Sequence, residues 1–456
     1  MSGIPAAAER SLAVPDTLDA LRRGDLAGAR ELRLPAGLSE FPPEIFGLAD
    51  TLEVLDLTGG TLSRLPDDLG RLRKLRVLFC SGNRFERLPP VLGDCAALSQ
   101  IGFRGTGMRE VPGEALPPRL RWCTLTDNRI ERLPEALGER PFLQKLMLSG
   151  NRLRALPASL AGAANLELLR LSANRFDALP SWLAALPRLA WVAWAGNPVD
   201  GDGVSIQAPR VPWSALEVGE LLGEGASGRV HRAVWRADDA RWARPVALKL
   251  FKGAMTSDGL PEREMSACLA AGAHPNLTGG LGRVVGHPGG AEGLLMPLLP
   301  AHWRVLAGPP SLASCSRDEY DPALRLTPDA VLRLARSAAA AAAHLHANGL
   351  LHGDVYAHNL LWDGADGEAV LSDFGAASRL PAGVEGVALQ RVEVRAFGLL
   401  LGELLDRCTS EPAELIDLRS LEEACVQPDP RARPLMAEVS SALAAFVRAP
   451  GLQAAV

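Results

Sequence analysis

The sequence lacks long apolar runs, closely spaced cysteine pairs and a strong net charge. No stretch of the 456 residues approaches the roughly 18 consecutive apolar residues of a membrane span, and the nearest candidate, residues 337–343, is a short alanine run within a helical pattern. The seven cysteines form no CxxC pair, so reduced, mostly buried thiols are expected in place of a disulfide or metal framework. A net charge of −5 gives no electrostatic reason to expect nucleic acid or an acidic membrane as a partner.

The first residues also lack the features of a targeting signal. Residues 1–16 have neither the charged start nor the apolar run of a signal peptide, which predicts a cytoplasmic protein. The chain is 47% apolar and 22% charged, which is enough apolar material for two or three packed domains.

The first half of the chain contains an internal repeat. Leucine recurs in steps of 22 or 23 residues, and each occurrence opens an LxxLxL frame. An asparagine follows five of these leucines after eight residues. This is the leucine-rich-repeat pattern, in which stacked units share one continuous core and the asparagine satisfies buried backbone groups. The repeat leucines are Leu52, Leu75, Leu98, Leu120, Leu143, Leu166 and Leu189, and the asparagines are Asn83, Asn128, Asn151, Asn174 and Asn197.

The repeat pattern sets the predicted domain boundaries. Residues 1–28 are expected to cap the open end of the solenoid, with a short amphipathic helix over 16–28. Residues 29–204 form the leucine-rich-repeat domain, which includes a degenerate first unit at Leu32 and Leu34. A turn-rich exit places the next boundary near residue 205, and residues 205–456 form the second domain.

The positions between the buried leucines are expected to form an exposed concave face. Apolar, aromatic and charged side chains at these positions predict a surface for a protein substrate or partner, because exposed apolar patches mark interaction sites. The alternative is that this face packs against the second half of the chain itself. The positions are Val54, Val77, Phe79, Trp122, Lys145, Met147, Leu168, Arg170 and Trp191.

The second half carries motifs suited to phosphoryl transfer. His352-Gly-Asp354 is followed by Asn359 and by the triplet that begins at Asp373. Upstream lie a glycine-rich segment over 222–230 and a strand pattern that ends at Lys249. These four motifs, in this order, resemble the protein-kinase family over roughly residues 215–447. The resemblance implies an α/β leucine-rich-repeat solenoid followed by an α+β bilobal protein-kinase-like fold.

The resemblance also implies ATP and Mg²⁺ as cofactors and assigns roles to residues. Asp354 would be the catalytic base or a carboxylate that orients the substrate. Lys249 would pair with the phosphates and with Glu264, for which Glu262 is the alternative. Asn359 and Asp373 would be the Mg²⁺ ligands, since oxygen donors suit this cation. The nucleotide would lie against Leu222, Gly223, Glu224, Gly225, Ala226, Ser227, Gly228, Val230, Ala247, Lys249, Met296 and Leu361.

The sequence departs from the family pattern around the catalytic loop. Gly353 stands where most protein kinases have an arginine that pairs with a phosphorylated activation loop, so regulation by such phosphorylation is not expected. Tyr356 stands where serine/threonine kinases usually have lysine, and His358 stands where tyrosine kinases often have arginine. Only 17 residues, 376–392, separate the Asp-Phe-Gly triplet from Glu393, which replaces the usual aspartate of the central helix. Without an Ala-Pro-Glu motif, Arg433 lacks its usual ion-pair partner.

Three functions fit these motifs. The pattern favours a bacterial leucine-rich-repeat protein kinase that transfers the γ-phosphate of ATP to a protein hydroxyl, serine or threonine in preference to tyrosine, with the repeats recognising a partner or substrate. His-Gly-Asp also occurs in small-molecule phosphotransferases of the aminoglycoside and choline kinase type. The third possibility is a pseudokinase scaffold that binds ATP without transferring phosphate.

Overall fold

The computed structural model describes residues 14–201, 208–225, 227–236, 243–253, 255–256, 258–409 and 415–446. The chain forms two compact units, Met1–Leu143 and Gln144–Val456. The second unit therefore contains the last repeats together with the second half of the chain. The boundary predicted near residue 205 lies outside the described residues. No helix in the described ranges is both long and apolar enough to cross a membrane.

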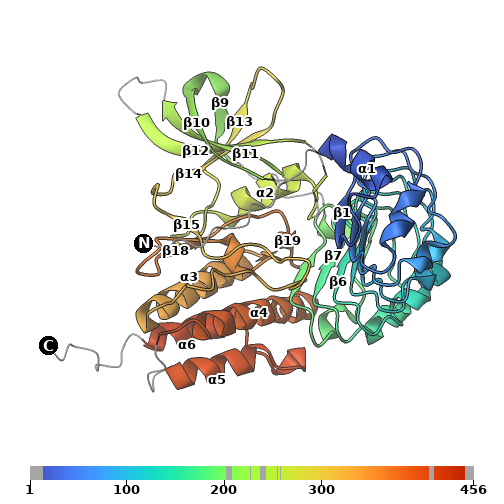
Figure 1. The fold of residues 1–456 in the computed structure, drawn as a ribbon. Helices are drawn as coiled ribbons and strands as arrows, with labels where there is room; N and C mark the ends of the chain where they lie inside the picture. The colour runs from blue at the N-terminus through green and yellow to red at the C-terminus, as the bar shows by residue number, and fades with distance from the viewer. Residues whose placement is uncertain are drawn as a thin grey trace, which may run out of the picture. The chain divides into compact units, whose positions relative to one another are not determined.

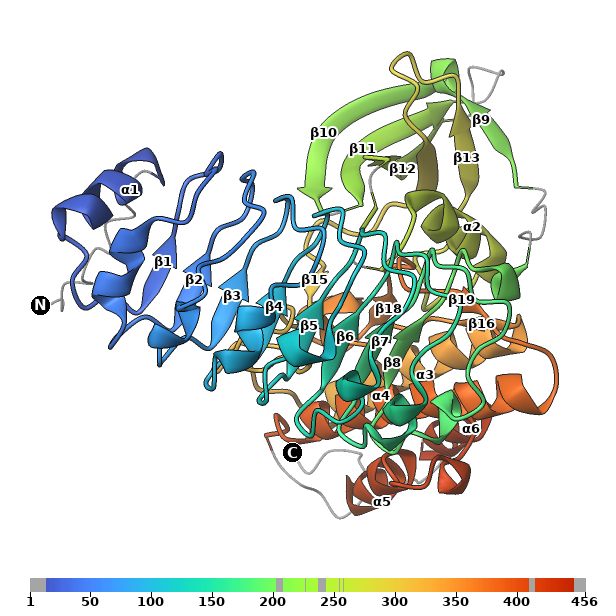
Figure 2. The same cartoon turned by 90° about the vertical axis from the view of Figure 1, so that its right-hand side faces the viewer.

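The first unit is a row of short parallel strands that follows one helix, as Figure 2 shows. Each strand pairs in register with the next, from β1 to β5. Short 3-10 helices lie between the strands and return the chain to the start of the next repeat. The elements are α1 (Val14–Arg23), β1 (Glu31–Arg33), η1 (Pro43–Leu48), β2 (Val54–Asp56), η2 (Leu69–Arg71), β3 (Val77–Phe79), η3 (Pro90–Asp94), β4 (Gln100–Gly102), η4 (Gly113–Ala115), β5 (Trp122–Thr124) and η5 (Glu135–Leu137).

The repeat leucines and asparagines have the predicted structural roles. Leu52, Leu75 and Leu98 are fully buried, as expected for a core shared between stacked units. Asn83 donates from Nδ2 to the carbonyls of Leu57 and Cys80, at 2.8 and 2.9 Å, and its Oδ1 accepts from a backbone N–H of the preceding repeat. The asparagine thus satisfies three buried backbone groups in the bend after the strand, where an unpaired group would be costly.

The second unit begins with three further repeat strands, which are again parallel and in register. They are β6 (Lys145–Met147), β7 (Leu168–Arg170) and β8 (Trp191–Ala193), and the 3-10 helices η6 (Ala158–Gly162), η7 (Leu183–Ala185) and η8 (Pro198–Asp200) follow them.

A small lobe built on a six-stranded sheet comes next. The strand order is β10-β11-β12-β14-β13-β9, and β9 runs parallel to β13 at the edge while the other pairs are antiparallel. Val246, Leu248 and Leu295 lie at its core. The elements are β9 (Arg210–Pro212), η9 (Trp213–Ala215), β10 (Leu216–Glu224), β11 (Gly228–Arg236), β12 (Ala243–Phe251), α2 (Pro261–Ala271), β13 (Gly282–Val285) and β14 (Gly293–Pro297).

A mainly helical large lobe follows, and Figure 1 shows its helices stacked below the small-lobe sheet. Helix α3 contains the alanine run, which is packed in the protein interior, and Thr327 caps its first turn by accepting from the Ala330 N–H at 3.2 Å. The elements are β15 (Arg304–Val305), α3 (Pro328–Ala347), β16 (Leu350–Leu351), η10 (Ala357–Asn359), β17 (Leu360–Trp362), β18 (Ala369–Leu371), β19 (Ser378–Arg379), α4 (Val384–Leu405), α5 (Leu415–Cys425), η11 (Pro430–Ala432) and α6 (Met436–Ala445).

The central helix α4 begins before the motif at Glu393. Because α4 starts at Val384, the last nine of the 17 residues between the Asp-Phe-Gly triplet and Glu393 belong to this helix. Ser378 and Arg379 in this segment form β19, which pairs with β16 just before the catalytic loop. The segment is therefore a short strand and turn with no extended loop.

Candidate active site

The glycine-rich segment joins β10 to β11 at the edge of the small lobe. A Cβ atom at Gly228 would lie 2.5 Å from the Leu250 carbonyl oxygen, so close strand packing requires this glycine. A Cβ atom at Gly223 or Gly225 would meet no protein atom within 4 Å. Packing does not require those two glycines, whereas the close approach of a phosphate to the backbone would. Ala226, the remaining member of the predicted set in this turn, lies outside the described residues.

A cavity of about 700 Å³ lies under the glycine-rich strands, between the two lobes. Leu222 is 46% exposed and contributes to the roof, and Leu361 contributes to the floor. A second cavity of about 300 Å³ adjoins it along the glycine-rich turn and is lined by Glu224, Gly225, Ser227 and Gly228. Every predicted nucleotide-contacting residue among those described lines one of the two cavities; in the larger one they are Leu222, Gly223, Val230, Ala247, Lys249, Met296 and Leu361.

Lys249 and Glu264 meet at the back of this cavity. Lys249 lies on β12, Glu264 lies in the first turn of α2, and the Lys249 ammonium forms an ion pair with Oε1 of Glu264. Glu262, the alternative partner, is exposed. Burial raises the pKa of Glu264 above its ordinary value, and the charge of Lys249 opposes that rise. The structure therefore selects Glu264 as the partner of the strand lysine.

The catalytic loop brings Asp354 and Asn359 together. The Asn359 amide donates from Nδ2 to the Asp354 backbone carbonyl at 2.9 Å and to its Oδ2 at 3.0 Å, which leaves the amide oxygen available as a ligand. His352 is fully buried, with its ring 5.5 Å from that of Phe374. Asp373 has a positive φ of 64°, and its Oδ1 accepts from the Gly375 N–H at 3.0 Å.

Glu393 of α4 anchors the start of this loop. Its Oε1 accepts from the Gly353 N–H at 2.6 Å, and its Oε2 lies 2.7 Å from Nε2 of His346. Burial alone would raise the pKa of Glu393, but the hydrogen bond from His346 lowers it below its ordinary value. The longer glutamate thus still reaches the backbone of the catalytic loop.

Comparison with known families agrees with this geometry. Residues 216–395 match the family model of protein tyrosine and serine/threonine kinases, and residues 118–191 match that of leucine rich repeats. The chain contains a protein kinase domain fused to leucine-rich repeats. No curated protein matches the chain. The region from β10 to β19 that holds the cavity and the catalytic loop lies within the kinase match.

The last repeats of the second unit pack on the catalytic loop of the kinase domain. Arg170, at the end of β7, is 2% exposed and donates to Oδ1 of Asp354. It also donates to the Gly353 carbonyl at 3.0 Å and to Oδ1 of Asp258 at 2.7 Å. Burial alone would lower the pKa of Arg170, but the two carboxylates raise it, so the guanidinium stays charged. One repeat side chain therefore links Asp354 of the large lobe to the loop before α2.

Trp191 of β8 and Trp194, which follows this strand, extend the contact. The Trp191 ring stacks on that of Tyr356 at a centroid distance of 4.2 Å, and its Nε1 donates to the Val355 carbonyl at 3.1 Å. The Trp194 N–H donates to Oγ of Ser378 at 2.9 Å, and its Nε1 donates to the Arg379 carbonyl at 3.1 Å. The repeats therefore cover both the catalytic loop and the segment after the Asp-Phe-Gly triplet.

The predicted exposure of the concave face is wrong for these repeats. Lys145, Met147, Leu168, Arg170 and Trp191 are all buried. Lys145 donates to the Cys315 carbonyl at 3.4 Å, and the contacts of Arg170 and Trp191 also go to the kinase domain. This part of the face is occupied by the chain itself, as the alternative interpretation proposed.

In the first unit, the residues at the equivalent concave positions are less buried. Val54, Phe79 and Trp122 are half-buried, whereas Val77 is buried. Trp122 donates from Nε1 to Oγ1 of Thr124 at 2.9 Å.

The departures at Gly353 and Arg433 have a structural explanation in the repeats. Gly353 has φ +75°, and a Cβ atom there would lie 2.6 Å from the carbonyl oxygens of both Val192 and Ala376. Arg433 is buried and donates to three backbone carbonyls, one of which is that of Pro187 at 2.7 Å. Burial and the nearby Arg395 lower its pKa to about 10. Backbone carbonyls of the repeats thus lie against both positions at which the sequence departs from the family pattern.

Sequence reasoning missed the partners of Arg170. Asp258 lies between β12 and α2 outside any motif, and nothing in its sequence surroundings marks it. Arg170 was singled out as a concave residue, but the repeat period does not indicate what such a residue contacts. Trp303, which lines the large cavity, was also missed, because it lies beyond the strand pattern that predicted the neighbouring Met296.

Proposed function

We propose that the kinase domain transfers the γ-phosphate of ATP to a protein hydroxyl, serine or threonine in preference to tyrosine. The observation that carries this proposal is the convergence of Lys249, Glu264 and Asp373 on the cavity lined by the glycine-rich strands. This is the set of charges that phosphoryl transfer requires at the phosphate end of a nucleotide.

The residues present fit ATP and Mg²⁺. The roof and floor of the cavity are apolar at Leu222 and Leu361, which suits an adenine ring, and its charged end suits phosphates. The amide oxygen of Asn359 and the carboxylate of Asp373 are the oxygen donors that Mg²⁺ prefers. Mg²⁺ would supply neutralisation of the phosphate charge.

The roles of the side chains follow from their positions. Lys249, oriented by Glu264, would hold the phosphates. Asp354 would accept the proton of the attacking hydroxyl while a bond forms between that oxygen and the γ-phosphorus and the bond to ADP breaks. Asn359 would orient Asp354 through the hydrogen bond to Oδ2. Incubation of the full-length protein with labelled ATP and Mg²⁺ tests the proposal, and label transfer that persists in Lys249→Ala would contradict it.

Two alternatives remain distinguishable by experiment. In a pseudokinase scaffold, ATP would bind without label transfer, even after the contacts of Arg170 are removed. In a small-molecule phosphotransferase, label would appear on an aminoglycoside or choline and not on protein. Gly353, which this chain shares with the small-molecule phosphotransferases, does not favour that class, because the close approach of Val192 accounts for a glycine at this position.

We also propose that the repeats of the second unit hold the kinase domain in a closed state. Both carboxylate oxygens of Asp354 already accept hydrogen bonds, one from Arg170 and one from Asn359. Trp191 and Trp194 cover the surface beside the catalytic loop, which a protein substrate would otherwise approach. The ATP cavity is lined by other residues and is left accessible. These contacts support an enzyme that binds ATP but must release β7 and β8 before it phosphorylates another protein.

Arg170→Ala tests the closed state. The variant should phosphorylate a generic protein substrate on the order of tenfold faster than the wild type, because one carboxylate oxygen of Asp354 is freed, while the KM for ATP stays unchanged. Arg154→Ala is the matched control, since Arg154 lies in the same repeats and its ion pair with Asp177 is exposed. A fall in activity of Arg170→Ala would instead mean that Arg170 supports Asp354 in catalysis.

The segment after the Asp-Phe-Gly triplet supports a further prediction about regulation. Ser378 is the only hydroxyl residue between positions 376 and 392, and it is buried against Trp194. We therefore expect that activity does not require phosphorylation of this segment. Phosphatase-treated protein should reach the same initial rate as untreated protein. A lag that pre-incubation with ATP removes would contradict this expectation.

The remaining proposals concern location and origin. Six of the seven cysteines are buried, which supports reduced thiols and a cytoplasmic location. The composition, rich in alanine, arginine and glycine, supports a bacterial origin.

The repeats of the first unit are proposed to recognise a protein partner or substrate.

A further inference from the structure

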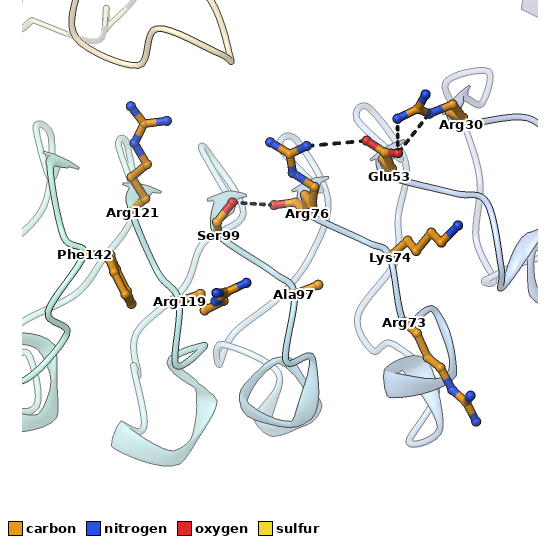
Figure 3. A pocket seen from close by; sticks show the side chains of 10 residues that line it. All are labelled: Arg30, Glu53, Arg73, Lys74, Arg76, Ala97, Ser99, Arg119, Arg121 and Phe142. Atoms are coloured by element: carbon orange, nitrogen blue, oxygen red, sulfur yellow. Dashed lines mark hydrogen bonds and ion pairs between the residues drawn. The ribbon is translucent and has the colours of Figure 1, made fainter.

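A groove of about 570 Å³ lies on the repeats of the first unit, on the edge where the strands begin. Figure 3 shows its side chains, of which six are cationic and only one is acidic. The lining residues are Arg30, Glu53, Arg73, Lys74, Arg76, Ala97, Ser99, Arg119, Arg121 and Phe142.

The repeat register explains why these charges gather. Lys74 and Arg76 flank the repeat leucine Leu75, and Arg119 and Arg121 flank Leu120 in the same way. Because the repeats stack in register, equivalent positions lie in columns across the edge.

The repeat between these two carries small residues in the same columns. Ala97 and Ser99 flank Leu98, so the groove is hollow between two cationic repeats. Arg30 has the same repeat position as Arg76 and Arg121 and lies at one end of the groove. Phe142 has the same repeat position as Lys74 and Arg119 and lies at the other end.

The positive charge of the groove is only partly compensated. Glu53 forms ion pairs with Arg30 and with Arg76, the latter at 3.5 Å. Arg73, Lys74 and Arg119 are exposed, and within the described ranges no carboxylate lies at ion-pair distance from any of them. Figure 3 shows Lys74 and Arg119 extending over the face while Arg73 turns away from it. Unpaired cations in a hollow raise the local concentration of an anionic ligand.

We propose that this groove binds an acidic segment of a partner protein. Carboxylates of the segment would pair with Lys74 and Arg119, and Phe142, which is 53% exposed at one end, would contact an apolar side chain. The charge pattern favours a short protein segment over a nucleic acid. The neighbouring strands carry Glu31 and Asp56, which would repel a long polyanion that runs past the groove. This binding rests on the partner recognition proposed above for the repeats of the first unit, and it does not depend on phosphoryl transfer.

A fluorescein-labelled poly-glutamate peptide titrated with the full-length protein tests the proposal by anisotropy. The wild type should bind it at low salt and more weakly at high salt, because salt screens exposed charges. The double variant Lys74→Glu, Arg119→Glu should bind on the order of tenfold more weakly. The control variant Arg64→Glu, Arg109→Glu reverses two exposed charges of the same unit outside the groove and should bind like the wild type.

Two results would overturn the proposal. One is equal peptide affinity of the groove variant and the wild type. The other is tighter binding of a labelled single-stranded oligonucleotide than of the peptide, which would make the groove a nucleic-acid site. Kinase activity is not part of the readout, so failure of this inference and failure of the proposed phosphoryl transfer are separate outcomes.

Discussion

Replacement of Asp354 by asparagine should lower phosphoryl transfer by about 10²–10⁴-fold and leave the affinity for ATP unchanged. The amide cannot accept the proton of the attacking hydroxyl, whereas the cavity residues that contact the nucleotide are untouched. The comparison is best made in the wild type and in the Arg170→Ala background, where the substrate site is open. Rates with labelled ATP and a titration with a fluorescent ATP analogue measure the two quantities separately.

The Asp373→Asn variant tests the role of the second carboxylate in nucleotide binding. Because Asp373 lines the phosphate end of the cavity, its replacement should weaken nucleotide binding in the presence of Mg²⁺ as well as transfer. Asp354 also neutralises the buried Arg170, so thermal unfolding of each variant is needed to separate lost chemistry from lost folding. Undiminished turnover by folded Asp354→Asn would mean that another group serves as the base.

Replacement of Gly353 by alanine should destabilise the second unit by roughly 3 kcal/mol or more. A left-handed backbone costs a non-glycine residue about 1–2 kcal/mol. Overpacking against fixed atoms adds about 1–3 kcal/mol, and the carbonyls of Val192 and Ala376 at 2.6 Å are backbone atoms that a side-chain rotation cannot move.

Gly349→Ala separates these two costs. Gly349 has a similar φ of +70°, but a Cβ atom there would meet nothing within 4 Å. The Gly349→Ala variant should therefore lose only the stability that the left-handed backbone costs. Chemical denaturation of the two variants then gives the contribution of the close packing of the Val192 and Ala376 carbonyls. Equal losses would mean that both carbonyls move away from residue 353 at little cost.

Local patterns in the sequence were sufficient to predict most of the fold and the residues that line the two cavities. The leucine period and its asparagines depend on contacts between adjacent repeats, so both could be predicted from spacing alone. Lys249, Asn359 and Asp373 belong to motifs whose order along the chain is informative. The start of α4 at Val384 was missed because the predicted motif begins at Glu393 and helical residues before it carry no family signature.

The contacts of Arg170 could not be predicted, because they join segments that are far apart in the chain. Arg170 and Asp354 are separated by 184 residues, and no periodic pattern relates them. Gly353 and Arg433 did carry a signal in the sequence as departures from the family pattern. The physical cause of both, backbone of the last repeats at Val192 and Pro187, became apparent only in three dimensions.

The contact between β8 and the catalytic loop restricts how this gene can evolve. Repeat arrays commonly gain and lose whole units by duplication and deletion, since each unit contacts only its neighbours. An insertion or deletion between β7 and β8 would bring a different side chain against Tyr356 or separate Arg170 from Trp191. Array length is therefore expected to vary on the N-terminal side of Gln144, while the last three units are inherited together with the kinase domain as one block.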